Sequence, residues 1–135
     1  MKTYITYAVL FLALSSCQKE KKLTFSTLDL DETRCSECPL VGINIPQALN
    51  NSKTAKTINE ALKEEIIEIL NYDDETDATS IKEAVKSFSD GYWELKKLYP
   101  EETTFWEAKI EGTITYDGPE FLTIELNSFL FTGGA

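Results

Sequence analysis

Two amphipathic helices in succession are the feature that most constrains the fold of this 135-residue chain. Thr57-Ile58-Asn59-Glu60 has the spacing of a capping box, with Thr57 as the N-cap and Glu60 as the reciprocal carboxylate. Ser80-Ile81-Lys82-Glu83 repeats that pattern. We expect the first helix to end near Asn71, where acidic residues follow, and the second to end before Pro100. The apolar positions recur at helical spacing: Ile58, Leu62, Ile66, Ile69 and Leu70, then Ile81, Val85, Phe88, Tyr92, Leu95 and Tyr99.

Segments in which apolar and polar residues alternate precede and follow the two predicted helices in the sequence. Residues 23–30 change face partway and predict a strand with a bulge or bend, and Val41, Ile43 and Ile45 predict a second strand that Pro46 ends. After the helices, a third strand places Trp106, Ala108, Ile110, Ile114 and Tyr116 on one face. Asp117-Gly118 marks a hairpin turn within residues 116–119. Leu122, Ile124 and Leu126 form its return strand, and residues 128–131 begin another.

The predicted fold is therefore α+β, with two consecutive amphipathic helices packed on an antiparallel β-sheet. Gly91 falls inside the second helix, where glycine costs up to about 1 kcal/mol relative to alanine. Its presence there indicates a kink or a close contact.

The N-terminal segment has the layout of a secretory signal peptide. Lys2 is followed by a mostly apolar run from Tyr4 to Leu14, which is too short to span a bilayer. Leu14-Ser15-Ser16-Cys17 resembles a bacterial lipobox, in which the cysteine is lipidated and becomes the new N-terminus. A short buried core helix is the alternative, and it leaves Cys17 without a role.

The sequence accordingly divides into a signal peptide over 1–16, a charged tether over 17–22 and an α+β domain over 23–135. Lys19-Glu20 loosely resembles the surface-export signal of Bacteroidota-type lipoproteins, although a solvated linker explains these residues equally well. The expected location is the cell envelope, either periplasmic or surface-exposed, with the chain held to a membrane by lipid on Cys17.

Charge and composition exclude several classes of function. The net charge of −10 becomes −11 when the signal peptide and its single Lys2 are removed. Such a chain opposes binding to nucleic acid and favours a basic partner, although solubility alone also explains the charge. The sequence has no histidine, so a Ser-His-Asp triad and any zinc site that needs histidine are excluded.

Cys35-Ser36-Glu37-Cys38 is the sharpest chemical motif. Such a pair can be a redox centre, half of a metal site or a structural disulfide. Pro39 and a strand pattern follow it, whereas a thioredoxin-like pair opens a helix. In an oxidising envelope we expect a disulfide between Cys35 and Cys38.

Two acidic clusters have alternative interpretations. Glu64, Glu65 and Glu68 can be imagined as a cation or acid–base site, but the water-facing side of a helix explains them better. Residues 73–77 are rich in carboxylates, but they lack the spacing and the glycine of an EF-hand, which favours an exposed acidic loop. We predict no metal, no cofactor and no catalytic residue.

Aromatic side chains are the remaining candidates for ligand contact. Trp93 lies off the apolar stripe of its helix and is the best candidate for stacking on a sugar ring. The others fit core stripes: Tyr92, Tyr99, Trp106 and Tyr116. For all five, packing in the core or in an interface is the favoured interpretation.

Taken in order, these segments resemble the PdaC-type domain of bacterial envelope proteins. The resemblance is carried by the cysteine pair, Ile45-Pro46, Ile58-Asn59, the Trp-containing strand, and the stretches Phe121-Leu122-Thr123-Ile124 and Phe131-Thr132-Gly133-Gly134-Ala135. In that family the domain precedes the catalytic domain of a peptidoglycan deacetylase and forms part of the lysozyme-sensing ectodomain of an anti-sigma factor. A Gly-Gly-Ala-His stretch commonly leads into a second domain, so we expect the chain to be truncated before that domain.

The resemblance implies an envelope domain and not the deacetylase activity, which belongs to a separate domain. We expect a lipid-anchored binding or sensing module for peptidoglycan or for a basic wall-degrading protein such as lysozyme. The alternatives are a thiol-redox or hydrolytic envelope enzyme, and a structural half-domain that is inactive without its C-terminal part.

Overall fold

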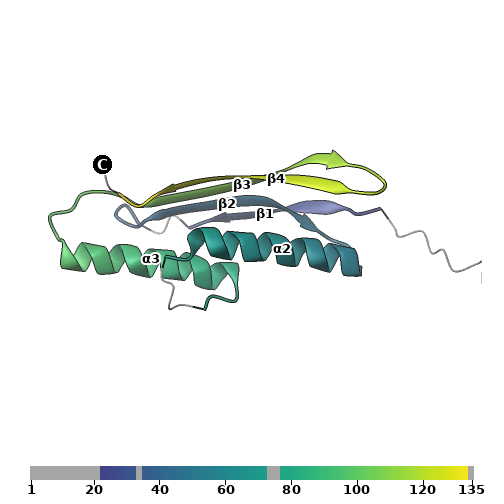
Figure 1. Cartoon of the computed structure of the whole chain (residues 1–135). Helices are drawn as coiled ribbons and strands as arrows, with labels where there is room; N and C mark the ends of the chain where they lie inside the picture. Colours follow the sequence, from purple (N-terminus) through teal and green to yellow (C-terminus); the bar gives the residue numbers. More distant parts are fainter. Residues whose placement is uncertain (1–21, 33–34, 73–76, 134–135) are drawn as a thin grey trace, which may run out of the picture.

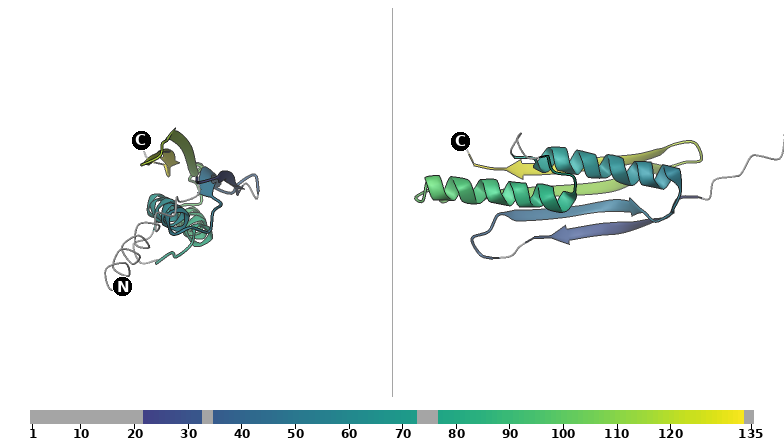
Figure 2. Two further views of the ribbon diagram at one scale, coloured as in Figure 1. Left: turned by 90° about the vertical axis from the view of Figure 1, so that its right-hand side faces the viewer. Right: turned by 90° about the horizontal axis from the view of Figure 1, so that it is seen from below.

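A four-stranded sheet with two helices on one of its faces makes up the domain (Figure 1). The computed structural model describes residues 22–32, 35–72 and 77–133. Along the chain the elements are β1 (Phe25–Asp31), β2 (Leu40–Ala48), α2 (Lys53–Leu70), α3 (Ile81–Leu98), β3 (Glu107–Asp117) and β4 (Leu122–Phe131). The strands lie side by side in sequence order, and Figure 2 shows both helices on the same side of them.

The sheet is mixed, because one of its three strand pairs is parallel. β1 with β2 and β3 with β4 are antiparallel, whereas β2 and β3 run in the same direction. The helices explain this: β2 ends at the end where α2 begins, and α2 and α3 carry the chain back along the sheet before β3 starts (Figure 1). A crossover of this kind is how parallel neighbours are connected. The predicted α+β class with two consecutive helices is confirmed, and the expectation of a wholly antiparallel sheet is corrected.

The core lies between the helices and the middle strands. Trp106 is 1% exposed, and it lies just before β3 among the rings of Tyr72, Phe88 and Tyr92, whose centroids are 4.6, 5.3 and 6.0 Å from its own. Tilted and edge-to-face ring contacts at these separations add to the burial of apolar area. The aliphatic part of the core comes from the predicted stripes: Val41, Ile43, Ile45, Leu62, Ile66, Leu70, Val85 and Ile110.

Helix α2 begins earlier than the sequence predicts. Its N-cap is Ser52, whose Oγ accepts a hydrogen bond of 3.1 Å from the Ala55 amide. Thr57 lies in the second turn and is exposed, so it is not the N-cap. The only buried residue of the first turn is Ala55, and the turn has no acidic side chain. Neither the spacing of large apolar residues nor a capping box therefore marks this turn in the sequence.

Helix α3 has the predicted start. Ser80 is its N-cap and accepts from the Glu83 amide at 3.3 Å, and the helix ends before Pro100. The Glu83 carboxylate accepts from both the amide and the hydroxyl of Thr79, each at 2.8 Å. These hydrogen bonds lower the pKa of Glu83 because they stabilise its ionised form.

Asn59 fastens α2 to the end of β2. Its side-chain oxygen accepts from the Ala48 amide at 2.8 Å, and its side-chain amide donates to the Ala48 carbonyl at 2.9 Å. The side chain thus satisfies both backbone groups of the last residue of β2, which would otherwise have no strand partner on that side.

A β-bulge in β3 turns Tyr116 away from the core. The register passes from Ile114 opposite Ile124 to Tyr116 opposite Thr123, so one extra residue is inserted between them. The insertion changes the phase of the alternation, and Tyr116 is 45% exposed. The predicted core position of Tyr116 is therefore wrong, as is that of Tyr99, which is 61% exposed where the end of α3 projects past the sheet (Figure 1).

Two further expectations about strands are corrected. The pairing of β1 with β2 is continuous from Phe25 to Asp31, so the bulge predicted within residues 23–30 does not occur in that strand. Residues 128–131 continue β4 and do not begin a new strand, because they pair with β3 without a turn. The predicted hairpin is confirmed, and its turn closes with the Gly118 amide donating to the Phe121 carbonyl at 3.1 Å.

Candidate functional site

A disulfide joins Cys35 to Cys38 in the loop between β1 and β2, as predicted. The loop is held to α3 by the Tyr92 hydroxyl, which donates to the Glu37 carbonyl at 2.9 Å. Burial raises the pKa of the Tyr92 phenol, and the negative charge of Glu37 raises it further. Pro39 and then β2 follow Cys38, so the disulfide does not open a helix as a thioredoxin-like pair does.

A groove of about 590 Å³ lies between this loop and α3. One wall is formed by Glu32, Cys38 and Pro39, and the other by α3 residues that include Lys86, Ser89, Asp90 and Trp93. The groove therefore brings together the disulfide and the predicted aromatic contact residue, which lie 55 positions apart.

Trp93 is suited to stacking because its ring is supported and accessible. It is 43% exposed, and the ring of Tyr92 meets it edge-on with centroids 5.0 Å apart. Lys86 and Asp90 form an ion pair within the two turns that precede Trp93, and both line the same groove, so charged hydrogen-bonding groups border the aromatic surface. An aromatic plane beside such groups matches the alternation of apolar and hydroxyl faces on a sugar ring.

The face of the sheet opposite the helices is a second candidate surface, which we call the outer face (Figure 2). Strand alternation places Val41, Ile43 and Ile110 toward the helices, so their neighbours in sequence point outward. The strand register then aligns the charged outer-face residues, which are Asp29, Asp31, Glu107, Lys109, Glu111 and Glu125.

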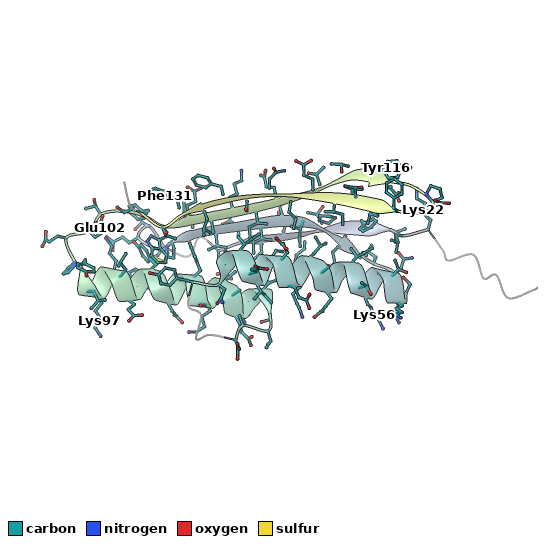
Figure 3. All side chains as sticks on the ribbon, in the orientation of Figure 1. Lys22, Lys56, Lys97, Glu102, Tyr116 and Phe131 are labelled. Atoms are coloured by element: carbon teal, nitrogen blue, oxygen red, sulfur yellow. A yellow bond between two sulfur atoms is a disulfide. The ribbon has the colours of Figure 1, made fainter. Side chains whose placement is uncertain are left out.

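The outer face is strongly acidic. Among the described residues, it carries five carboxylates and one ammonium group, Lys109, which is paired with Glu111 at 3.0 Å. The formal charges of these six described side chains sum to −4. Phe129 and Phe131 lie on the same face of β4 and are 53% and 43% exposed, and Figure 3 places Phe131 at the far end of the sheet from Lys22. A charged surface beside exposed aromatic side chains is typical of protein-binding surfaces.

Residues 32–135 match the family model described as deacetylase PdaC, so the match covers most of the chain. The chain belongs to the PdaC family. The PdaC domain is also similar to the crystal structure of a DUF3298 family member from Bacteroides fragilis, with a TM-score of 0.59 at 20% sequence identity. The similarity covers 85% of this chain and 53% of that chain, and it shows the fold. No curated protein matches the chain.

The remaining predicted sites of the PdaC domain give a mixed result. Glu64, Glu65 and Glu68 are exposed on α2, as expected for a solvated face. Cys17 and residues 73–76 lie outside the described residues. Among the described residues, no group of three acidic or cysteine side chains is placed to hold a metal ion, and neither helix is apolar enough over its length to cross a membrane.

The outer face was missed by analysis of the sequence. On β3 alone, the alternation of Glu107, Lys109 and Glu111 with apolar residues predicts only an ordinary strand with one face in water. The acidic character of the surface appears only when β1 and β4 add their carboxylates through the pairing register. No local sequence signal specifies which strands are neighbours, so the cluster could be found only from the topology.

Proposed function

We propose that this PdaC domain is a binding module of the bacterial cell envelope and that the outer face receives a basic protein, for example a lysozyme. The clustering of Asp29, Glu107, Glu111 and Glu125 on one accessible face of the sheet is the observation that carries this proposal. Clustered charge of one sign raises the rate of encounter with an oppositely charged partner. Phe129 and Phe131 supply the apolar contacts that charge alone does not provide.

Charge reversal on the outer face tests this function. Asp29→Lys with Glu125→Lys changes two carboxylates on that face, and Glu64→Lys with Glu68→Lys makes the same change in net charge on the exposed side of α2. Calorimetric titration with hen egg-white lysozyme should show a dissociation constant about tenfold or more higher for the first variant, and a much smaller change for the second. Equal weakening in both variants contradicts a specific surface, as does the absence of binding by the unmodified chain at physiological salt.

A wall glycan in the groove beside Trp93 is the second candidate function. The supported, half-exposed indole ring and its polar neighbours favour it. Trp93→Ala should abolish retention on insoluble peptidoglycan in a pull-down, whereas Trp93→Phe should keep part of it, because stacking on a sugar ring needs an aromatic plane. Unchanged retention by Trp93→Ala rules out this site.

We further propose that Cys17 carries lipid and holds the domain to an envelope membrane, with residues 18–22 as a tether. The lipobox-like Leu14-Ser15-Ser16-Cys17 supports this assignment. Several acyl chains, at about 0.8 kcal/mol for each buried methylene, anchor a protein firmly. The intact mass of the native product should show cleavage before Cys17 and an added lipid, and Cys17→Ser should release the protein from membranes. An unprocessed N-terminus would remove the assignment.

A further inference from the structure

The end of the domain where residue 22 leads into β1 combines three separate segments (Figure 1). The β3–β4 turn, the first turns of α2 and the start of the described chain meet there, and a Lys22–Asp117 ion pair of 3.1 Å links the start of the chain to the turn. We call this end, formed by residues 22–24, 49–58 and 116–122, the tether end. Figure 3 shows Lys22, Lys56 and Tyr116 grouped at it.

Exposed apolar side chains are present at the tether end, as they are at the opposite end of the sheet. The rings of Tyr116 and Phe121 are stacked, with centroids 4.4 Å apart and planes at 17°, although they are 45% and 59% exposed. Leu49 is 60% exposed nearby. Behind the turn, a groove of about 1030 Å³ is lined largely by apolar side chains, including Ile58, Leu122 and Ile124. Exposed aromatic side chains beside an apolar groove are typical of an interaction surface.

The charge of the tether end differs in sign from that of the whole chain. Its charged residues are Lys22, Lys53, Lys56, Asp117 and Glu120, which sum to +1, whereas the chain as a whole carries −10. Lys53 and Lys56 are both exposed in the first turns of α2. These lysines therefore lie at the same end of the domain as the aromatic pair, while most of the carboxylates lie elsewhere.

We propose that the tether end is a membrane-contact surface, with Tyr116 and Phe121 in the interfacial layer of a bilayer and the lysines facing anionic headgroups. Aromatic rings favour the membrane–water interface, and nearby lysines add attraction to anionic lipid. The inference deepens the proposed lipid anchoring and rests on it, because Cys17 lies only five residues before Lys22. A chain of five residues spans at most about 18 Å, which keeps this end close to an anchored lipid.

Tryptophan placed at each end of β4 tests the proposal. In full-length protein reconstituted into vesicles of phosphatidylethanolamine and phosphatidylglycerol, Phe121→Trp reports on the tether end and Phe129→Trp on the opposite end of the sheet. Both positions are exposed, and the signal of Trp93 and Trp106 is subtracted with the unsubstituted chain. Brominated lipid should quench Phe121→Trp at least about twofold more than Phe129→Trp. Equal quenching at the two positions overturns the proposal.

A charge variant separates headgroup attraction from simple tethering. Lys53→Glu with Lys56→Glu should reduce the quenching of Phe121→Trp, whereas Lys82→Glu with Lys97→Glu on exposed positions of α3 should leave it unchanged. Equal effects of both pairs would contradict a specific contact. Lysozyme titration of the same proteins distinguishes this inference from the function proposed for the outer face, because substitutions at the tether end should not alter that affinity.

Discussion

The Tyr92 hydroxyl on α3 lies 2.9 Å from the backbone carbonyl of Glu37, inside the loop closed by the disulfide. This hydrogen bond fixes one wall of the Trp93 groove against the other, because Tyr92 and Trp93 are adjacent while Glu37 and Cys38 are adjacent. The residue that orders the groove is thus a buried neighbour of the exposed ring.

Tyr92→Phe should lower the free energy of unfolding by about 1 kcal/mol, because it removes one hydrogen bond and keeps the ring in the core. Urea denaturation followed by fluorescence gives the value.

The stability of the native protein should also depend on the ionisation of Tyr92. Since the pKa of Tyr92 is raised above its ordinary value of about 10, the contribution of Tyr92 to stability is retained below that pH and is lost as the pH rises through the higher folded value. The phenylalanine variant should therefore lose less stability than the native protein as the pH rises above about 10, and an equal loss in both proteins would refute the coupling.

Loss of the disulfide should cost about 2 kcal/mol in Cys35→Ser with Cys38→Ser, because the closed loop is very short. The variant should remain folded, since the loop is also held through Tyr92. Unfolding of the native chain with and without reductant provides an independent measurement. A variant that is unfolded at room temperature would show that the loop depends on the bond more than its length implies.

Gly91→Ala should destabilise the domain although it removes a glycine from a helix. An added Cβ would overlap the ring of Tyr72, which packs on Trp106, so a predicted close contact is confirmed as the reason for this glycine. Overpacking costs about 1–3 kcal/mol, against a gain of about 1 kcal/mol in helix propensity. Gly42→Ala is the matched control, since a Cβ there meets no atom within 4 Å. Stabilisation by Gly91→Ala in thermal denaturation would show that Tyr72 moves aside without cost.

Ser52→Ala should cost about 1 kcal/mol, because it leaves the Ala55 amide without its capping acceptor. Thr57→Ala should be neutral or slightly stabilising, since Thr57 is exposed within the helix. Denaturation midpoints of the two variants give a direct comparison. The opposite order would place the start of α2 at Thr57.

The elements whose patterns are local were predicted well. α3 was predicted from its first to its last turn because Ser80, Glu83 and Pro100 mark both ends. The burial of Tyr92 and Trp106 followed from simple periodicity. The fold class followed from the order of the elements, and the disulfide from the cysteine pair, the strand pattern after Pro39 and the expected oxidising envelope.

The errors arose where a distant neighbour decides the outcome. Tyr116 was assigned to the core because a one-residue bulge, set by pairing with β4, cannot be read from the alternation of β3. Tyr99 continues the helical stripe, but none of the four described strands extends far enough to cover it. The parallel pairing of β2 with β3 depends on the path of two helices together, and the acidic outer face depends on that pairing in turn.

β4 is a continuous strand of ten residues, and its length sets how far the sheet extends from the tether end. At about 3.3 Å for each residue, the strand is roughly 33 Å long, comparable to the thickness of a bilayer core. If the turn before Leu122 rests on lipid, Phe131 stands at that height above it. The sheet then holds Phe129 and Phe131 away from the lipid, and a partner that approaches from the cell wall would contact these two residues before it reaches the membrane.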